Sequence, residues 1–212
     1  MSFELSLDEG TFLAKLARRA IATYLEKDKK ITAPQNTPAK FKEKYGVFVT
    51  LNKIIDGREE LRGCIGFPLP DFPLVDAIID SAISAATRDP RFPRVTLQEL
   101  KDIIIDVSVL TSPTLIEVSD PMDYVKEVEI GKDGLIVERG WFKGLLLPQV
   151  PVEWQWNVED FLANSCMKAG LSPDAWLIKG TKIYKFSCVI ARELSPNGSV
   201  KVIDMRKGEE GT

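Results

Sequence analysis

The chain has 212 residues, a formal net charge of -3 at pH 7 and 44% hydrophobic residues, which is ordinary for a folded domain. A small negative charge argues against a protein that grips nucleic acid over its whole surface, because such domains are usually basic. The sequence contains no run of about 18 apolar residues, so no membrane-spanning helix is expected. The acidic start, MSFELSLDEG, does not have the pattern of a signal peptide.

The chain contains no histidine and three widely separated cysteines, Cys64, Cys166 and Cys188. Without histidine, Ser-His-Asp and Cys-His mechanisms and histidine-based zinc sites are excluded. Three isolated cysteines fit a reducing compartment better than a disulfide framework, so we expect a cytoplasmic protein. With no C-x-x-C pair, no metal or other cofactor is predicted. Any enzymatic proton transfer would have to use carboxylates, Lys, Tyr or Cys.

The first half of the chain alternates between helical and strand patterns. Ser6 and Glu9 have the spacing of a capping box, and Asp56-Gly57 supplies a hairpin turn. The expected elements, in chain order, are a helix over 7–27, hairpin strands over 46–55 and 60–66, a helix over 74–89, a helical turn over 96–100 and a buried strand over 103–110.

The second half has shorter elements, and Ser112-Pro113-Thr114 marks a possible boundary. Asn157 is placed to cap a helix, and Gly170 is placed to end it. The expected elements are a short helix from Asp120-Pro121, strands over 128–130, 135–138 and 144–147, a helix over 158–169 and strand character over 182–192. Because helices and strands mix without a regular βαβ order, we expect an α+β fold with antiparallel sheets.

One stretch is distinctive: residues 61–66 spell L-R-G-C-I-G. This hexapeptide resembles the signature of the AMMECR family. Further blocks match prokaryotic members of that family in order, over about residues 46–194: SAISAATRDPRFPRV, LQEL, VSVL, IGKDGLIV, GLLLPQV and FLANSCMKAGL.

The resemblance implies two unequal α+β subdomains, each with an antiparallel sheet, and a cleft between them that the hexapeptide faces. The larger, 1–114 with 180–212, would contain both termini, and the smaller, 115–179, would be inserted in it. The resemblance implies no established activity. It suggests a role in RNA metabolism or modification, with RNA, a Memo-like protein or a radical-SAM protein as partner.

Strand alternation gives the hexapeptide a first physical interpretation. Arg62 and Cys64 would share one face and Leu61 would bury on the other. Same-face neighbours lie roughly 6.5–7 Å apart, where a positive charge favours a thiolate by about 0.6–2.5 kcal/mol and lowers the pKa of the thiol. Alternatively, Cys64 is a small buried hydrophobe and Arg62 binds a carboxylate.

The glycines and nearby charged residues are further candidates. Gly63 and Gly66 could let a ligand approach closely, or they could serve strand packing. Around a rigid turn, Arg88, Arg91 and Arg94 could bind phosphate or carboxylate groups. The alternative is that Asp89 pairs with a neighbouring arginine while Phe92 anchors the turn.

Candidates also occur later in the chain. Glu153 could be a general base or an exposed carboxylate without a catalytic role. The four tryptophans, Trp141, Trp154, Trp156 and Trp176, could form a contact surface or a core, and we expect Trp176 in the core. Cys166 and Cys188 are expected to be buried.

Two hypotheses follow from these residues. In the first, the protein binds a protein or RNA partner and Arg62 supplies a charge-assisted hydrogen bond. In the second, it is an enzyme or enzyme subunit in which Cys64 is a nucleophile or redox residue and Arg62 holds the thiolate. The first predicts that function survives Cys64→Ser, and the second predicts that it does not.

Overall fold

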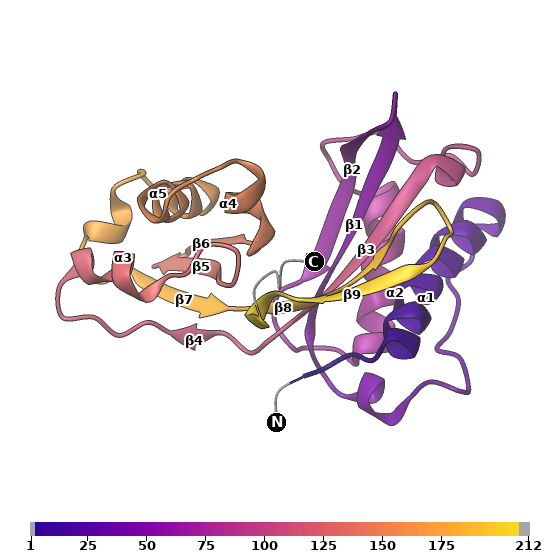
Figure 1. Ribbon diagram of the computed structural model, residues 1–212, viewed down its shortest axis with the longest axis horizontal. Coiled ribbons are helices and arrows are strands. Elements are labelled where there is room, and N and C mark those ends of the chain that lie inside the picture. The colour runs from indigo at the N-terminus through magenta and orange to yellow at the C-terminus, as the bar shows by residue number, and fades with distance from the viewer. Residues whose placement is uncertain (1–2, 208–212) are drawn as a thin grey trace. The chain divides into compact units, whose positions relative to one another are not determined.

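The computed structural model describes residues 3–207 and has an α+β fold with two antiparallel sheets (Figure 1). The described residues form two compact units. Unit 1 comprises residues 3–110 and 189–203, and unit 2 comprises residues 111–188 and 204–207.

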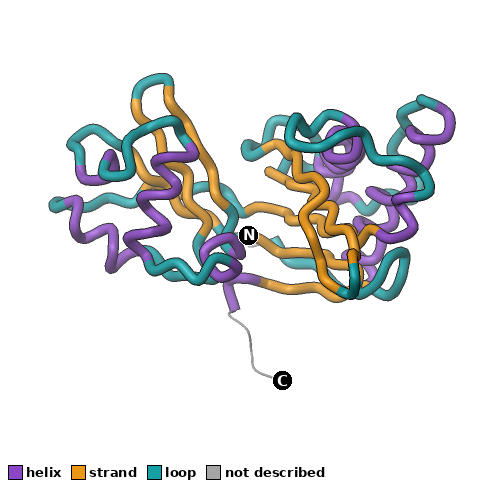
Figure 2. The backbone as a smooth tube through the Cα atoms, turned by 90° about the horizontal axis from the view of Figure 1, so that it is seen from above, coloured by secondary structure: helices purple, strands orange, loops and turns teal. Residues whose placement is uncertain are grey.

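Unit 1 is built on a five-stranded sheet with the strand order β2-β1-β3-β8-β9. Its elements are α1 (Leu7–Lys27), β1 (Gly46–Ile55), β2 (Arg58–Phe67), α2 (Leu74–Thr87), β3 (Ile103–Leu110), β8 (Cys188–Glu193), β9 (Val200–Asp204) and two short 3-10 helices, Ala39–Lys42 and Glu99–Asp102. Both long helices lie on the same side of the strands (Figure 1, Figure 2). Val47, Val49 and Leu51 of β1 are fully buried in this core. In the strand order of this sheet, β2 lies at an edge.

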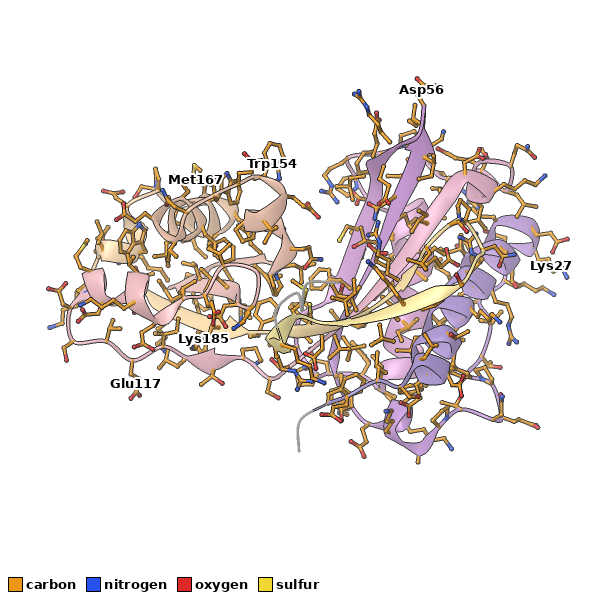
Figure 3. The ribbon with its side chains drawn as sticks, in the orientation of Figure 1. Lys27, Asp56, Glu117, Trp154, Met167 and Lys185 are labelled. Atoms are coloured by element: carbon orange, nitrogen blue, oxygen red, sulfur yellow. The ribbon has the colours of Figure 1, made fainter. Side chains whose placement is uncertain are left out.

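The local patterns of unit 1 predict its elements well. Helix α1 has the predicted bounds, and Ser6 and Glu9 form the capping box through reciprocal bonds of 3.3 and 2.8 Å. The β1–β2 hairpin turns at Asp56 and Gly57, and both residues have positive φ (Figure 3). Helix α2 ends at Thr87 rather than at the predicted 89, because Arg88 leaves helical geometry and Asp89 makes other bonds.

Unit 2 contains a four-stranded sheet with the strand order β4-β7-β5-β6. Its elements are β4 (Thr114–Leu115), α3 (Tyr124–Glu127), β5 (Gly134–Arg139), β6 (Phe142–Leu146), α4 (Gln149–Glu153), α5 (Val158–Lys168), β7 (Lys182–Phe186) and three 3-10 helices, Pro121–Asp123, Ala175–Leu177 and Met205–Lys207. Helix α5 begins with a capping box at Asn157, and Phe161, Leu162 and Cys166 bury its inner face.

One strand prediction in unit 2 is wrong. Residues 128–130 form no strand, because the Glu129 amide donates to Oδ2 of Asp133 at 2.9 Å and the chain turns there. The strand character predicted over 182–192 is confirmed, and it is divided between β7 and β8. The two strands are separated at Ser187, whose amide donates to the Thr111 hydroxyl and whose carbonyl accepts from the Thr111 amide, each at 2.8 Å.

No helix among residues 3–207 is long and apolar enough to cross a membrane.

Candidate functional site

A β-bulge in β2 breaks the alternation expected for the hexapeptide. Leu51 lies opposite Gly63, but Asn52 lies opposite Leu61, so Arg62 is the extra residue. Leu61 is 44% exposed, and the prediction that it is buried is wrong. The bulge therefore gives Arg62 and Cys64 different surroundings although they are two residues apart.

Arg62 is held by a carboxylate. Its Nε and Nη2 donate to Oε1 and Oε2 of Glu99 at 2.7 and 3.1 Å, and Lys53 Nζ lies 3.0 Å from Oε1. The Arg62 guanidinium also lies 5.8 Å from the ring centroid of Phe92, and its side chain is only 11% exposed. Burial raises the pKa of Glu99, but hydrogen bonds from Arg62 and Lys53 outweigh it and lower that pKa overall. The alternative in which Arg62 binds a carboxylate is confirmed.

Cys64 is half-buried and bonded through both its side chain and its backbone. The Thr50 hydroxyl donates to Cys64 Sγ at 3.2 Å. The Cys64 amide faces away from β1 and donates to Oδ2 of Asp89 at 2.9 Å, while its carbonyl lies 3.5 Å from Nη2 of Arg91. The Asp89 bond satisfies an edge amide that would otherwise be unpaired.

Asp89 fixes the loop beside Cys64. It is 4% exposed, and it accepts from Nε and Nη2 of Arg91 at 3.0 and 2.7 Å. Hydrogen bonds from Arg91, opposed by burial and assisted by the Cys64 amide, lower the pKa of Asp89 to about 2. The Arg91 guanidinium lies 5.3 Å from the Phe92 ring centroid. The predicted pairing of Asp89 with a neighbouring arginine is confirmed.

The other two arginines of this segment lie apart from these contacts. Arg88 is exposed. Arg94 pairs with Asp28 at 3.4 Å and lies over the Tyr24 ring. Of the three predicted arginines, the structure therefore brings only Arg91 to Cys64.

The two hexapeptide glycines are packed against protein atoms. A Cβ on Gly63 would lie 2.2 Å from the carbonyl oxygen of Ala85 in α2. A Cβ on Gly66 would lie 2.1 Å from the carbonyl oxygen of Val47 in β1. Both positions match the alternative in which the glycines serve packing, because the space of their missing side chains is already filled.

Asp106, which is not among the residues predicted from the sequence, lies in line with Cys64 across the sheet. Thr50 is the register partner of Cys64 on β2 and of Asp106 on β3, so the three side chains form a row on one face. Oδ2 of Asp106 accepts from Asn52 at 3.2 Å and from Arg192 at 2.7 Å. Oδ1 is buried and has no hydrogen-bond partner among residues 3–207.

The environment of Asp106 changes its ionisation. The residue is 8% exposed, and burial raises its pKa to about 6, against the opposing charge of Arg192 and with help from Glu59 and Glu193. Its signal in the sequence is a single acidic residue within the apolar run IIIDVSVL. Ionisable groups with strongly perturbed pKa values are concentrated at functional sites.

The raised pKa of Asp106 gives a stability prediction. An aspartate whose pKa is higher in the folded than in the unfolded chain stabilises the fold at low pH. That contribution is lost as pH rises from about 4 to about 6. In the wild type, the free energy of unfolding should therefore fall by an amount on the order of 2–3 kcal/mol across this pH window, and we expect Asp106→Asn to remove that fall. Urea unfolding of both chains at pH 4, 5, 6 and 7 measures the two slopes. Parallel slopes would contradict the prediction.

Residues predicted from the second half of the chain lie in unit 2. Glu153 is exposed at the end of α4. Trp176 is 6% exposed, which confirms it as a core residue, whereas Trp141 is 101% exposed. Trp154 is 68% exposed (Figure 3). Its ring stacks on that of Trp156 with centroids 6.1 Å apart.

Cys166 and Cys188 are buried as expected, and burial raises the pKa of their thiols to about 11 and about 12. Among residues 3–207, no group of three His, Cys, Asp or Glu side chains could hold a metal ion.

Comparison with known proteins supplies the last observation. A family model described as AMMECR1 matches residues 14–191. Protein PH0010 of Pyrococcus horikoshii is 52% identical over 202 residues, which cover 95% of this chain and 98% of that protein. Protein MJ0810 of Methanocaldococcus jannaschii is 53% identical over 196 residues, 92% of this chain and 96% of that protein. The crystal structure of PH0010, titled as an uncharacterized protein, matches with a TM-score of 0.91 over 95% of this chain and all of the other.

Proposed function

Since the chain belongs to the AMMECR1 family, we propose from the contacts of Cys64 that it is an enzyme, or an enzyme subunit, that uses this thiol as a nucleophile. The observation that carries the proposal is the hydrogen bond from the Thr50 hydroxyl to Cys64 Sγ at 3.2 Å. A donor aimed at sulfur stabilises the thiolate relative to the thiol, and the thiolate is the reactive form.

The surroundings of Cys64 support this role. Cys64 is half-buried, whereas Cys166 and Cys188 are buried. The pKa of Arg91 is raised, mainly by its hydrogen bond to Asp89, and the negative charge that Cys64 can carry acts in the same direction. Because a thiolate at Cys64 favours the charged form of Arg91, the Arg91 cation in turn stabilises that thiolate. The supporting groups are therefore Thr50 and Arg91, whereas Arg62 is engaged by Glu99.

The proposal is tested by the rate of alkylation with iodoacetamide, measured against pH and resolved for each cysteine by peptide mass spectrometry. We expect Cys64 to react with a midpoint below the ordinary thiol value of about 8.5, while Cys166 and Cys188 react only after unfolding. Thr50→Val is expected to raise the midpoint and to slow the reaction several-fold at pH 7, because it removes the donor to sulfur. An ordinary midpoint for Cys64, unchanged in Thr50→Val, would overturn the proposal.

A second candidate function is the binding of a protein partner, such as the Memo-like or radical-SAM protein that the family resemblance suggests. The observation that favours it is the Arg91 guanidinium, which is 49% exposed, stacked on Phe92 and held rigid by Asp89. Rigid, partly exposed arginine and aromatic side chains are enriched at binding hot spots. A protein partner is favoured over RNA because the net charge of the chain is -3.

Binding and catalysis predict opposite outcomes for Cys64→Ser. If the site binds a partner, Arg91→Glu abolishes complex formation with purified candidate proteins, and Cys64→Ser retains it. Complex formation is measured by biolayer interferometry. The exposed Arg88→Glu is the matched control for the charge change. Equal loss in both arginine variants would indicate a general charge effect and contradict a specific role for Arg91.

A further inference from the structure

The row of Cys64, Thr50 and Asp106 extends the thiol site across three strands. We propose that Asp106 is the proton acceptor for Cys64 and acts through the Thr50 hydroxyl. The inference rests on the proposed nucleophilic role of Cys64 and adds a positioning residue that does not itself touch the substrate. The geometry that carries it is the shared register, since Thr50 is the direct cross-strand neighbour of both other residues.

The hydroxyl of Thr50 is suited to pass a proton. It already lies 3.2 Å from Cys64 Sγ, and a hydroxyl has one donor and two acceptor positions and rotates to suit its partners. Directly opposed residues have Cβ atoms roughly 4.5–5.5 Å apart. A turn of the Thr50 side chain or one bridging water therefore spans the distance to Asp106.

The carboxylate of Asp106 presents one open acceptor. Asn52 and Arg192 both donate to Oδ2 and so fix the orientation of the group. Oδ1 is buried and makes no hydrogen bond within the described chain. A buried acceptor without a donor is costly, and a proton delivered through Thr50 would relieve that cost.

Other charged groups around Asp106 set its affinity for that proton. Arg192 on β8 favours the ionised form, and Glu59 on β2 and Glu193 on β8 favour the protonated form. Arg192 also pairs with Glu59. Burial also favours the protonated form, as the two glutamates do. The resulting pKa of about 6 makes Asp106 an effective base at neutral pH. On the Cys64 side, the charged neighbours are Asp89 and Arg91.

The implied chemistry is attack of the thiol on an electrophilic carbonyl, so the substrate class is an acyl donor. With p-nitrophenyl acetate as probe, a sulfur lone pair of Cys64 forms a bond to the carbonyl carbon, and the bond to p-nitrophenolate breaks. The thiol proton passes to Thr50 Oγ1, and the hydroxyl proton of Thr50 passes to Oδ1 of Asp106. The products are an acetyl thioester on Cys64, p-nitrophenolate and, after Asp106 loses its proton to water, one proton.

The experiment is the release of p-nitrophenolate in a single turnover, followed at pH 5–9, with acetylation located by peptide mass spectrometry. In the wild type we expect a burst on Cys64 whose rate rises through an inflection near pH 6, where Asp106 becomes a base. We expect Asp106→Asn and Thr50→Val each to slow the burst about tenfold or more at pH 7, within the usual range of general-base effects. Both should remove the inflection. Thr50→Ser, which keeps the hydroxyl, should restore most of the rate.

An Asp106→Asn variant that is not slower than the wild type would contradict the inference. If Asp106 only carries buried charge, its removal makes the thiolate easier to form, so Asp106→Asn would react as fast as the wild type or faster. That result overturns the inference and leaves the proposed function standing. Equal rates in Thr50→Val and Thr50→Ser overturn the inference and also contradict the role of the Thr50 hydroxyl in the proposed function. A wild-type burst that survives in Cys64→Ser overturns the proposed function together with the inference.

Folding of the variants is checked by circular dichroism and thermal unfolding. Ser108→Ala is the matched control, because Ser108 lies two residues from Asp106 on β3 and its buried hydroxyl also makes no hydrogen bond among residues 3–207. We expect this control to react like the wild type. If Asp106→Asn does not fold, the pH profiles of the two Thr50 variants decide the question: the inference requires the inflection near pH 6 to be lost in Thr50→Val and kept in Thr50→Ser, and an inflection that is unchanged in Thr50→Val overturns it.

Discussion

Glu193→Ala is expected to lower the free energy of unfolding by about 3–5 kcal/mol, the range for removing one partner of a buried ion pair. Glu193 is 2% exposed and accepts from Nε and Nη2 of Arg18 at 2.7 and 2.5 Å. Without the carboxylate, the Arg18 guanidinium would remain buried with its charge uncompensated.

The same ion pair joins four elements of unit 1: α1, the 3-10 helix Glu99–Asp102, β3 and β8. Arg18 lies on α1 and also donates to the carbonyls of Leu100 and Ile103 at 3.0 and 2.5 Å. Glu193 lies on β8 and accepts from the Ile105 amide of β3 at 3.0 Å. Removal of the carboxylate therefore leaves a buried amide without its partner as well as a buried cation, which is why we expect a loss far above that of a surface pair.

Urea unfolding at pH 7 measures the loss, and Asp80→Ala provides the control. Asp80 pairs with Lys30 where both side chains are about half exposed, 42% and 50%, and such pairs contribute about 0–1 kcal/mol. The double variant Arg18→Met with Glu193→Leu should recover much of the stability, because replacing both charges leaves neither unpaired. Comparable losses in Glu193→Ala and Asp80→Ala would contradict the buried-pair explanation.

Local patterns were sufficient to predict most elements of the fold. The capping box at Ser6 and the apolar periodicity after it define α1 within its own sequence, and the Asp56-Gly57 turn defines the β1–β2 hairpin in the same way. Segment 128–130 was predicted wrongly because Val and Ile favour strands, while the hydrogen bond of Asp133 to the Glu129 amide favours a turn.

The candidate site was only partly predictable, because most of its contacts cross between strands. Cys64 and Asp89 stand out in the sequence, but their neighbours Thr50 and Asp106 depend on the register of three strands. A one-residue bulge inverts which side chains share a face, so the position of Arg62 could not be derived from alternation. Glu99, its partner, comes from a 3-10 helix far along the chain.

Gly63→Ala is expected to lower the free energy of unfolding by about 3 kcal/mol, the upper end of the usual cost of overpacking. The new Cβ would lie 2.2 Å from the carbonyl oxygen of Ala85 and 3.1 Å from its carbonyl carbon. These are backbone atoms of α2, so no side-chain rotation can relieve the clash, and either β2 or the helix must move. We also expect Cys64, the next residue, to lose its bonds to Thr50 and Asp89 and its distinct alkylation midpoint.

The loss of stability expected for Gly63→Ala is opposite in sign to the usual effect of replacing glycine with alanine. A glycine in unstrained geometry is usually stabilised by alanine, by about 0.4–1 kcal/mol, because the unfolded chain loses freedom. Glu60→Ala, at an exposed position of the same strand, is the matched control and should change stability by less than about 0.5 kcal/mol. If Gly63→Ala is neutral or stabilising by urea unfolding, the close packing of β2 on α2 is not what requires glycine at this position of the hexapeptide. The requirement would then have to come from a ligand or partner at the surface around Cys64.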